Sequence, residues 1–285
     1  MNYEGQTRQG VRRKPQRRKN ALSTIVTIFI IAVVCTAVII GALYVSGIRL
    51  ISQTTESGET IKFFGKTVDG KPYSGTIYYP GGLTAKLSLA ENTLTYSDGS
   101  VYTGKIEILL RDGDGEMKYS NGDVYTGTFF GDEITGSGKF VFANGDVYEG
   151  ELEGGLKSGY GTYTWAEGSY YTGLFKDDQR NGAGFSLWVD GSSYDGTYVD
   201  GVKSGSGTFK FANGDIYTGE YVNDMRSGKG TYVWANGETY TGEFKDNTLN
   251  GEGTYTWASG RTYTGVFENG KMVATDGEDI AEPQN

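Results

Sequence analysis

The residues of this sequence that could do chemistry are carboxylates at short, regular spacing. Asp112 and Asp114, and the Asn-Gly-Asp triplets at 121–123, 144–146 and 213–215, resemble fragments of calcium-binding loops. They lack the spacing and the terminal Glu of an EF-hand, so we interpret them as turn residues and predict no metal site. Glu149 and Glu151 would be alternate residues on a solvated strand face, without the burial that raises the pKa of a catalytic acid.

Other catalytic and cofactor chemistry is disfavoured by composition. The chain of 285 residues has no His and one Cys, Cys35, which removes the imidazole bases and any disulfide or zinc framework. Gly-x-Gly recurs, but it does not open a helix in a βαβ unit, so no nucleotide site is predicted. The net charge of −9 argues against nucleic-acid binding. We therefore expect a protein that is not an enzyme and has no cofactor.

Aromatic rings form a second candidate site. The four tryptophans and three further rings recur at one position of a 23-residue period: Tyr119, Phe142, Trp165, Trp188, Phe211, Trp234 and Trp257. We call this set the aromatic column. Two interpretations stay open for it. It is the hydrophobic layer of a sheet, or it is a groove for a glycan, a peptide or an apolar helix, since exposed apolar patches usually mark partners.

The elements that must position these residues are repeats. Tyr-x-Gly occurs at Tyr73, Tyr102, Tyr125, Tyr148, Tyr171, Tyr194, Tyr217, Tyr240 and Tyr263. Every step from Tyr102 onward is 23 residues, whereas the first step is 29, which indicates a six-residue insertion near 80–90. A Gly lies three residues before each Tyr and a large apolar residue lies four after it. Fixed-period similarity of this kind is typical of repeat architectures.

One copy of the repeat predicts a β-hairpin. In residues 138–152, Gly138, Phe140 and Phe142 occupy alternate positions, and so do Tyr148, Gly150 and Leu152, as expected for strands with one largely aromatic face. A three-residue loop over 143–145 keeps both strands on one face and needs a positive φ at its last residue, Gly145. The Gly-x-Gly motif is predicted to form the opposite turn. Successive hairpins then build an elongated antiparallel all-β meander.

The repeat resembles the MORN family (membrane occupation and recognition nexus) over roughly residues 67–270. The resemblance rests on Gly-x-x-Tyr-x-Gly-x-aromatic followed by Gly-x-Gly-x-aromatic, as in 145–164 and 237–256. It implies a ribbon of about nine hairpins and, because MORN proteins are mostly scaffolds, a role in binding other molecules. The first and last copies depart from the pattern and are expected to act as caps.

An apolar segment precedes the repeats. Residues 25–45 would span roughly 31 Å as a helix, enough for a bilayer core of about 30 Å. Seven Lys and Arg residues lie within residues 1–20, whereas only Arg49 and Lys62 lie just after the segment. The positive-inside rule then places the N-terminus in the cytoplasm and the repeats across the membrane. The segment is longer than a cleaved signal's hydrophobic region, so we predict an uncleaved signal anchor.

The predicted organisation is a basic cytoplasmic tail over 1–20, a transmembrane helix over 21–48, a linker over 49–60, MORN repeats over 61–273 and an acidic disordered tail over 274–285. The function expected is a membrane-anchored scaffold of bacterial type that binds a protein partner in the cell envelope. The alternative is a module that binds cell-wall glycan or lipid through the aromatic column. Lipid is disfavoured because cations after the anchor are sparse in sequence: Lys203, Lys210, Lys229 and Lys245.

Overall fold

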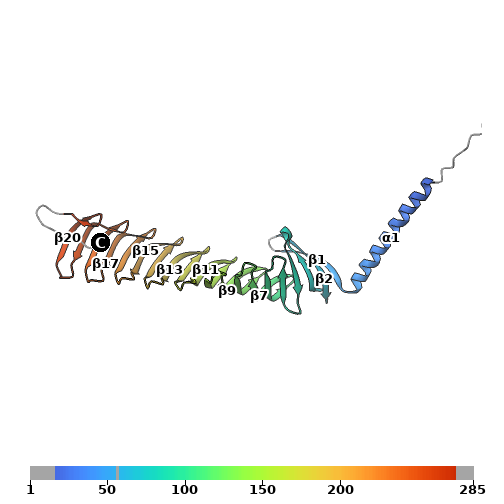
Figure 1. Ribbon diagram of the computed structural model, residues 1–285, viewed down its shortest axis with the longest axis horizontal. Coiled ribbons are helices and arrows are strands. Elements are labelled where there is room, and N and C mark those ends of the chain that lie inside the picture. Colours follow the sequence, from blue (N-terminus) through green and yellow to red (C-terminus); the bar gives the residue numbers. More distant parts are fainter. Residues whose placement is uncertain (1–16, 56–57, 274–285) are drawn as a thin grey trace, which may run out of the picture.

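The structure is a computed structural model that describes residues 17–55 and 58–273, with the side chains of the first helix described from Thr24. It consists of one N-terminal helix and one long, single-layer β-sheet (Figure 1). Most of the predicted basic tail and all of the predicted acidic tail lie outside the described residues.

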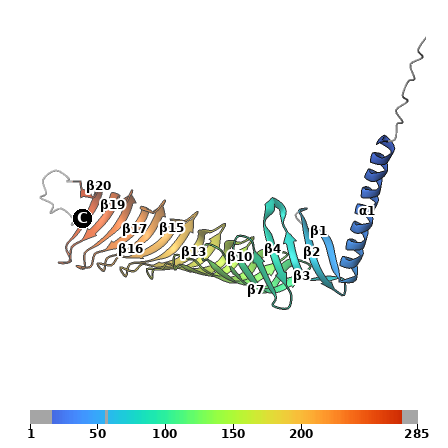
Figure 2. The same ribbon diagram turned by 45° about the vertical axis from the view of Figure 1, so that its right-hand side comes forward.

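Helix α1 (Arg17–Val45) contains the predicted membrane segment. Residues Thr24–Val45 are long and apolar enough to cross a membrane, and none of their hydrophobic window is covered by the rest of the protein. The helix projects from the N-terminal end of the sheet (Figures 1 and 2).

Residues 49–54, the first half of the segment predicted as a linker, instead belong to a strand. Strand β1 (Ile48–Thr54) follows the helix after only two residues and pairs along its whole length with β2. Thr67 donates two hydrogen bonds of 2.8 Å, from its N–H and its hydroxyl, to the carbonyl oxygen of Gly47. The Arg49 guanidinium lies 3.8 Å from the centre of the Tyr44 ring. The prediction failed because the alternating apolar residues of a single edge strand are too few to stand out beside a membrane segment.

All strands pair antiparallel with their neighbours in sequence, which gives a meander of 21 strands that twists along its length (Figure 2). A short 3₁₀ turn, η1 (Pro80–Gly82), separates β3 from β4. The strands after β1 are β2 Thr60–Val68, β3 Lys71–Tyr78, β4 Thr84–Ser88, β5 Thr93–Tyr96, β6 Val101–Glu107, β7 Leu110–Lys118, β8 Val124–Phe130, β9 Glu133–Val141, β10 Val147–Glu153, β11 Leu156–Thr164, β12 Tyr170–Lys176, β13 Gln179–Leu187, β14 Ser193–Val199, β15 Val202–Lys210, β16 Ile216–Val222, β17 Met225–Val233, β18 Thr239–Lys245, β19 Thr248–Thr256, β20 Thr262–Glu268 and β21 Lys271–Met272.

The turn predicted at Ala-Asn-Gly is confirmed. Phe142 donates its N–H to the carbonyl of Asp146, and Gly145 donates back to Phe142, both at 2.9 Å. Gly145 has φ 93°, a left-handed conformation that glycine adopts without a steric cost. The loop of three residues therefore leaves Phe142 and Tyr148 on the same face, as their spacing predicted.

The opposite turn is not made by Gly-x-Gly. Those glycines lie inside the longer strand of each hairpin, as Gly159 and Gly161 do in β11. The turn itself is a two-residue pair with φ positive at both positions, such as Asp177 and Asp178 at 47° and 68°. Asp, Asn and Gly tolerate this type I′ geometry, which suits the twist of a hairpin. Gly159, at φ 61°, lies within a bulge of β11, where residues 158–160 face the single residue Glu151 of β10. Its positive φ explains the first glycine of the motif.

The repeat is held together by a tyrosine lying over two facing glycines. Gly150 and Gly161 pair across β10 and β11, and a Cβ built on Gly161 would lie 2.5 Å from the Tyr148 hydroxyl oxygen. The Tyr148 side chain is fully buried, and its hydroxyl donates 2.7 Å to the carbonyl of Glu151. The same tyrosine position is fully buried in seven consecutive repeats: Tyr102, Tyr125, Tyr148, Tyr171, Tyr194, Tyr217 and Tyr240.

Neighbouring repeats are joined by edge-to-face aromatic contacts. The Phe175 ring lies 5.1 Å from Tyr171 in its own repeat and 5.3 Å from Tyr148 in the preceding one. Pairs of this geometry add about 0.5–1.5 kcal/mol to the burial of the rings. Because each hairpin packs only on its neighbours, the ribbon has the nearest-neighbour character of a solenoid.

The two ends depart from the predicted frame. Tyr73 is only partly buried, and the fully buried ring at the first position is Phe63 of β2, which lies over the facing pair Gly65 and Gly75. Strands β4 and β5 form a further hairpin in which Leu87 faces Leu94 where glycines would stand. The step of 29 residues from Tyr73 to Tyr102 therefore arises because Tyr73 is not the buried ring of its hairpin. It does not come from an insertion into one repeat. Tyr263 is partly exposed, at the far end.

Candidate functional site

The aromatic column lies on the same face as the buried tyrosines. All seven rings are partly buried and pack against the hydrophobic core. Trp234, for example, lies 4.6 Å from Tyr232 and 5.3 Å from Tyr255, measured between ring centres. The structure thus supports a part of both interpretations: the rings belong to the hydrophobic layer of the sheet, and one side of them remains open.

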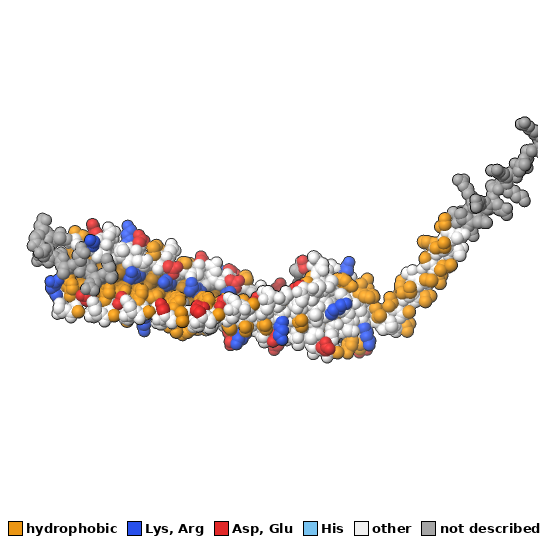
Figure 3. All heavy atoms as spheres, in the orientation of Figure 1, with side chains coloured by type: hydrophobic (Ala, Val, Ile, Leu, Met, Phe, Trp, Pro, Cys, Tyr) orange, Lys and Arg blue, Asp and Glu red, His pale blue; other side chains and the backbone are white. Residues whose placement is uncertain are grey.

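A second column lies beside the aromatic one, and sequence reasoning missed it. Five basic side chains occupy the position four residues before the second glycine of Gly-x-Gly: Arg111, Lys157, Arg180, Lys203 and Arg226. We call these residues the basic column. The same position holds Ile134, Leu249 and Met272 in other repeats. The signal was the 23-residue period itself, which places residues that are far apart in sequence on neighbouring hairpins. Figure 3 shows Lys and Arg side chains in a row within a hydrophobic band along the C-terminal half of the ribbon.

The basic side chains lie over aromatic rings. Arg180 lies 4.6 Å from the centre of the Tyr198 ring, and Arg226 lies 5.1 Å from that of Tyr232. The side chains of Lys157 and Lys203 are each 19% exposed. Such an arrangement combines cation–π attraction with burial of the aliphatic stem, while the charged end still reaches solvent.

Each basic residue is also tied to the turn of the next hairpin. Lys157 forms an ion pair of 2.9 Å with Asp178. Arg180 and Arg226 instead donate to backbone carbonyls, of Gly201 at 2.6 Å and of Asn247 at 2.7 Å. Within residues 17–55 and 58–273, neither of these two arginines has a carboxylate within 4 Å in an ion pair. No carboxylate among these residues therefore neutralises their charges at ion-pair distance.

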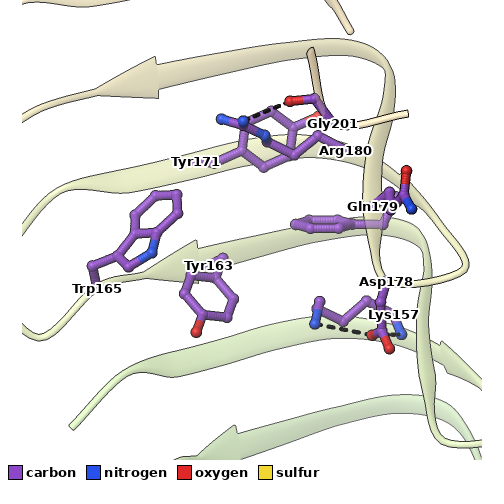
Figure 4. A pocket seen from close by; sticks show the side chains of 9 residues that line it. Lys157, Tyr163, Trp165, Tyr171, Asp178, Gln179, Arg180 and Gly201 are labelled. Carbon is purple, nitrogen blue, oxygen red and sulfur yellow. Dashed lines mark hydrogen bonds and ion pairs between the residues drawn. The ribbon is translucent and has the colours of Figure 1, made fainter. Parts of the chain in front are cut away.

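Shallow hollows recur between the two columns. One of about 350 Å³ is lined by Lys157, Tyr163, Trp165 and Arg180 (Figure 4). An equivalent hollow of about 340 Å³ lies beside Arg111 and Tyr119, and another of about 290 Å³ beside Arg226 and Trp234. Each combines a cation with the ring eight residues after it. In Figure 4 the Arg180–Gly201 contact lies at one end of the hollow and the Lys157–Asp178 contact at the other.

The cations of the column influence one another. Burial lowers the pKa of Lys203, and the charges of Arg180 and Arg226 lower it further, while Asp224 opposes the change. Lys203 and Asp224 are 3.9 Å apart, a weak pairing. The centre of the column is therefore a locally positive strip on a chain whose net charge after residue 20 is −15.

The Asn-Gly-Asp carboxylates lie at the other end of the strands, where they accept hydrogen bonds within the fold. Asp215 accepts hydrogen bonds from the Tyr232 hydroxyl at 2.6 Å, the Ala235 N–H at 2.8 Å and the Asn213 amide at 3.1 Å. Asp146 and Glu238 hold the corresponding tyrosines, Tyr163 and Tyr255, in the same way. In the part of the chain that the structure describes, no three His, Cys, Asp or Glu side chains are grouped as metal ligands.

The Asp215 contacts predict a loss of stability in acid. Burial would raise the pKa of Asp215, but the three hydrogen bonds outweigh it and the pKa is lowered. A lowered folded-state pKa stabilises the fold above the unfolded value of about 3.9, and this stability is lost as pH falls. We expect the urea midpoint to drop between about pH 4 and pH 2. Asp215→Asn should flatten part of this slope, and an unchanged slope would show that Asp215 contributes nothing to it.

Comparison with known proteins identifies the repeat. The family model described as MORN repeat matches residues 125–147, 148–170, 171–193, 194–216, 217–239 and 240–260. No curated protein matches this sequence.

Two solved structures are similar only at a low level. The TCP domain of SAS-4 (dCPAP) from Drosophila melanogaster, in complex with a proline-rich motif of Ana2 (dSTIL), is 16% identical, with a TM-score of 0.35 over 62% of this chain and 91% of that one. The TCP10 domain of Danio rerio CPAP, in complex with a STIL peptide, is 11% identical, with a TM-score of 0.26 over 83% and 100%. At these scores the likeness carries no argument about the partners of this chain.

Proposed function

This chain is a MORN-repeat protein across residues 125–260, and from that premise we propose that it is a non-enzymatic, membrane-anchored scaffold. The ribbon is presented on the extracytoplasmic side, where its aromatic and basic columns bind a protein partner of the cell envelope. The observation that carries this proposal is the row of hollows between the two columns. The two columns contain Trp, Tyr and Arg, the residue types most enriched at the energetic centres of protein interfaces.

The anchor supports the membrane part of the proposal. Thr24–Val45 carries no charged residue, and strand β1 begins three residues after it. The ribbon would therefore start at the membrane surface and extend from it. With about 4.8 Å between strands, 21 strands reach roughly 95 Å. The excess of Lys and Arg before Thr24 supports the orientation with the repeats outside the cytoplasm.

The absence of enzymatic activity is proposed on the chemistry of the site. The carboxylates beside the hollows accept hydrogen bonds or ion pairs, as Asp178 does from Lys157, which leaves them poorly suited to accept a substrate proton. The sequence contains no His to act in their place.

Sidedness is tested by protease treatment of intact cells that carry a C-terminal tag. The proposal expects the tag to be lost without lysis, and a tag that survives until lysis would place the ribbon in the cytoplasm. A cytoplasmic reporter must stay intact in the same sample.

Partner binding is tested by a photo-crosslinking residue placed at Trp165, which belongs to the aromatic column, is partly buried and lines the hollow of Figure 4. The matched control is the same residue at Leu174, which is exposed on the other face. We expect a discrete protein adduct from Trp165 only. Sedimentation of the purified protein with cell wall, together with loss of adduct, would favour the glycan alternative instead. Equal adducts from both positions would contradict a binding role for this face.

A further inference from the structure

The C-terminal end of the basic column has an uncompensated charge beside an open hollow. Arg226 donates to a carbonyl and pairs with no carboxylate among residues 17–55 and 58–273, and the hollow next to it is lined by Trp234, Leu249 and Gly270. The column then continues to the end of the sheet through Leu249 and Met272, which are apolar. Any segment that follows Met272 thus begins on the axis of the column.

The spacing of the column is set by the sheet. Two strands at about 4.8 Å give a rise of roughly 9.6 Å per repeat. Arg226 is two repeats from Met272, or roughly 19 Å, and Lys203 is three repeats away, or roughly 29 Å.

The residues after Met272 are opposite in charge to the basic column, and they are numerous enough to extend as far as Arg226 and Lys203. Residues 274–285 contain four carboxylates and no Lys or Arg: Asp276, Glu278, Asp279 and Glu282. An extended chain covers at most about 3.3 Å per residue, so from Met272 Asp279 reaches roughly 23 Å and Glu282 roughly 33 Å. Both values exceed the distances to Arg226 and Lys203. Asp279 and Glu282 are three positions apart, a separation of roughly 10 Å in an extended chain, which is close to the rise of one repeat.

We propose that the segment 274–285 binds back along the basic column, with Asp279 at Arg226 and Glu282 at Lys203, and so occupies the C-terminal part of the interaction surface. It would act as an intramolecular competitor, so that a partner with acidic groups must displace it. The proposal concerns the same surface as the proposed function but does not depend on sidedness or on the identity of the partner.

The proposed ion pairs should each be weak. They should still form because the segment is covalently connected to the surface that it binds. Exposed ion pairs contribute little and are screened by salt. A short flexible connection, however, gives an effective concentration in the millimolar range. A partner would then bind with an apparent affinity reduced by the fraction of molecules in which the segment is bound.

The test uses the full chain in detergent with Cys35→Ser and Ala281→Cys, which leaves one thiol for a nitroxide label between the two carboxylates. The label should quench tryptophan fluorescence, chiefly of Trp234, compared with a diamagnetic analogue. Quenching should fall several-fold at about 1 M NaCl, where the Debye length is about 3 Å. It should fall equally with Asp279→Asn plus Glu282→Gln, a change that leaves the sheet untouched.

A matched pair of variants removes two positive charges either from the basic column or from the other face of the sheet. Lys203→Gln plus Arg226→Gln should abolish the quenching, whereas Lys210→Gln plus Lys229→Gln should preserve it, because both of those lysines are exposed and alternate with the residues of the aromatic face. Absence of quenching in the parent protein, or quenching that survives removal of the two tail carboxylates, would overturn the proposal. Neither result affects the crosslinking and sidedness tests of the proposed function.

Discussion

Replacing Gly161 by Ala is expected to lower the free energy of unfolding by about 3 kcal/mol, the upper end of the usual cost of overpacking. The new Cβ would lie 2.5 Å from the Tyr148 hydroxyl oxygen and 2.6 Å from a ring carbon. The ring has nowhere to move. It is fully buried, its hydroxyl bonds to Glu151, and the Phe175 ring packs against it at 5.3 Å.

Urea unfolding followed by tryptophan fluorescence measures this effect. Gly154 is a matched control in the same hairpin, since a Cβ there meets nothing within 4 Å and its φ is 56°. Asn tolerates that conformation, so Gly154→Asn should change the stability by less than about 0.5 kcal/mol. If the two variants unfold alike, the packing of tyrosine on glycine is not what holds the repeat together.

Two arginines in the centre of α1 are expected to abolish membrane integration. An Arg at the middle of a membrane helix costs about 2.5–3.5 kcal/mol on insertion scales, so Ile30→Arg plus Val34→Arg should oppose insertion by about 6 kcal/mol. Both side chains are exposed in the structure, at 55% and 54%, so the change disturbs no packing within the protein.

Alkaline carbonate extraction of membranes provides the measurement. The parent protein should stay in the pellet and the double-Arg variant should move to the supernatant. Ile30→Leu plus Val34→Leu, which keeps the segment apolar, should behave like the parent. A double-Arg variant that remains integral would show that Thr24–Val45 is not the anchor.

Much of the fold was predictable because its causes are local. Alternation along 138–152 predicted two strands with a common aromatic face, and Gly145 predicted the turn that joins them; the structure has both. Length and apolar composition predicted the helix that contains Thr24–Val45. Each of these features depends on residues within one hairpin or one helix, so a single copy of the repeat is sufficient to infer them.

The predictions that failed concerned segments whose local sequence fits more than one structure. Tyr73 fits the Tyr-x-Gly motif, but Phe63 occupies the buried position because Gly75 pairs with Gly65. The segment 49–60 looked like a linker, but β1 within it pairs with β2. Strand pairing across the sheet decides such cases, and it is not visible in the spacing of one segment.

The candidate site was predictable only in part. The aromatic column follows from the 23-residue period, whereas Lys203 seemed to be an isolated cation. By itself the sequence determined the repeat, its inner turn, its aromatic face and an apolar helix, because these depend on neighbours in the chain. Only the tertiary structure decided that basic residues 23 positions apart stand in one row, because stacking of successive hairpins brings them together. It also decided which of them keep a free charge, because each partner lies in the turn of the next hairpin, as Asn247 does for Arg226.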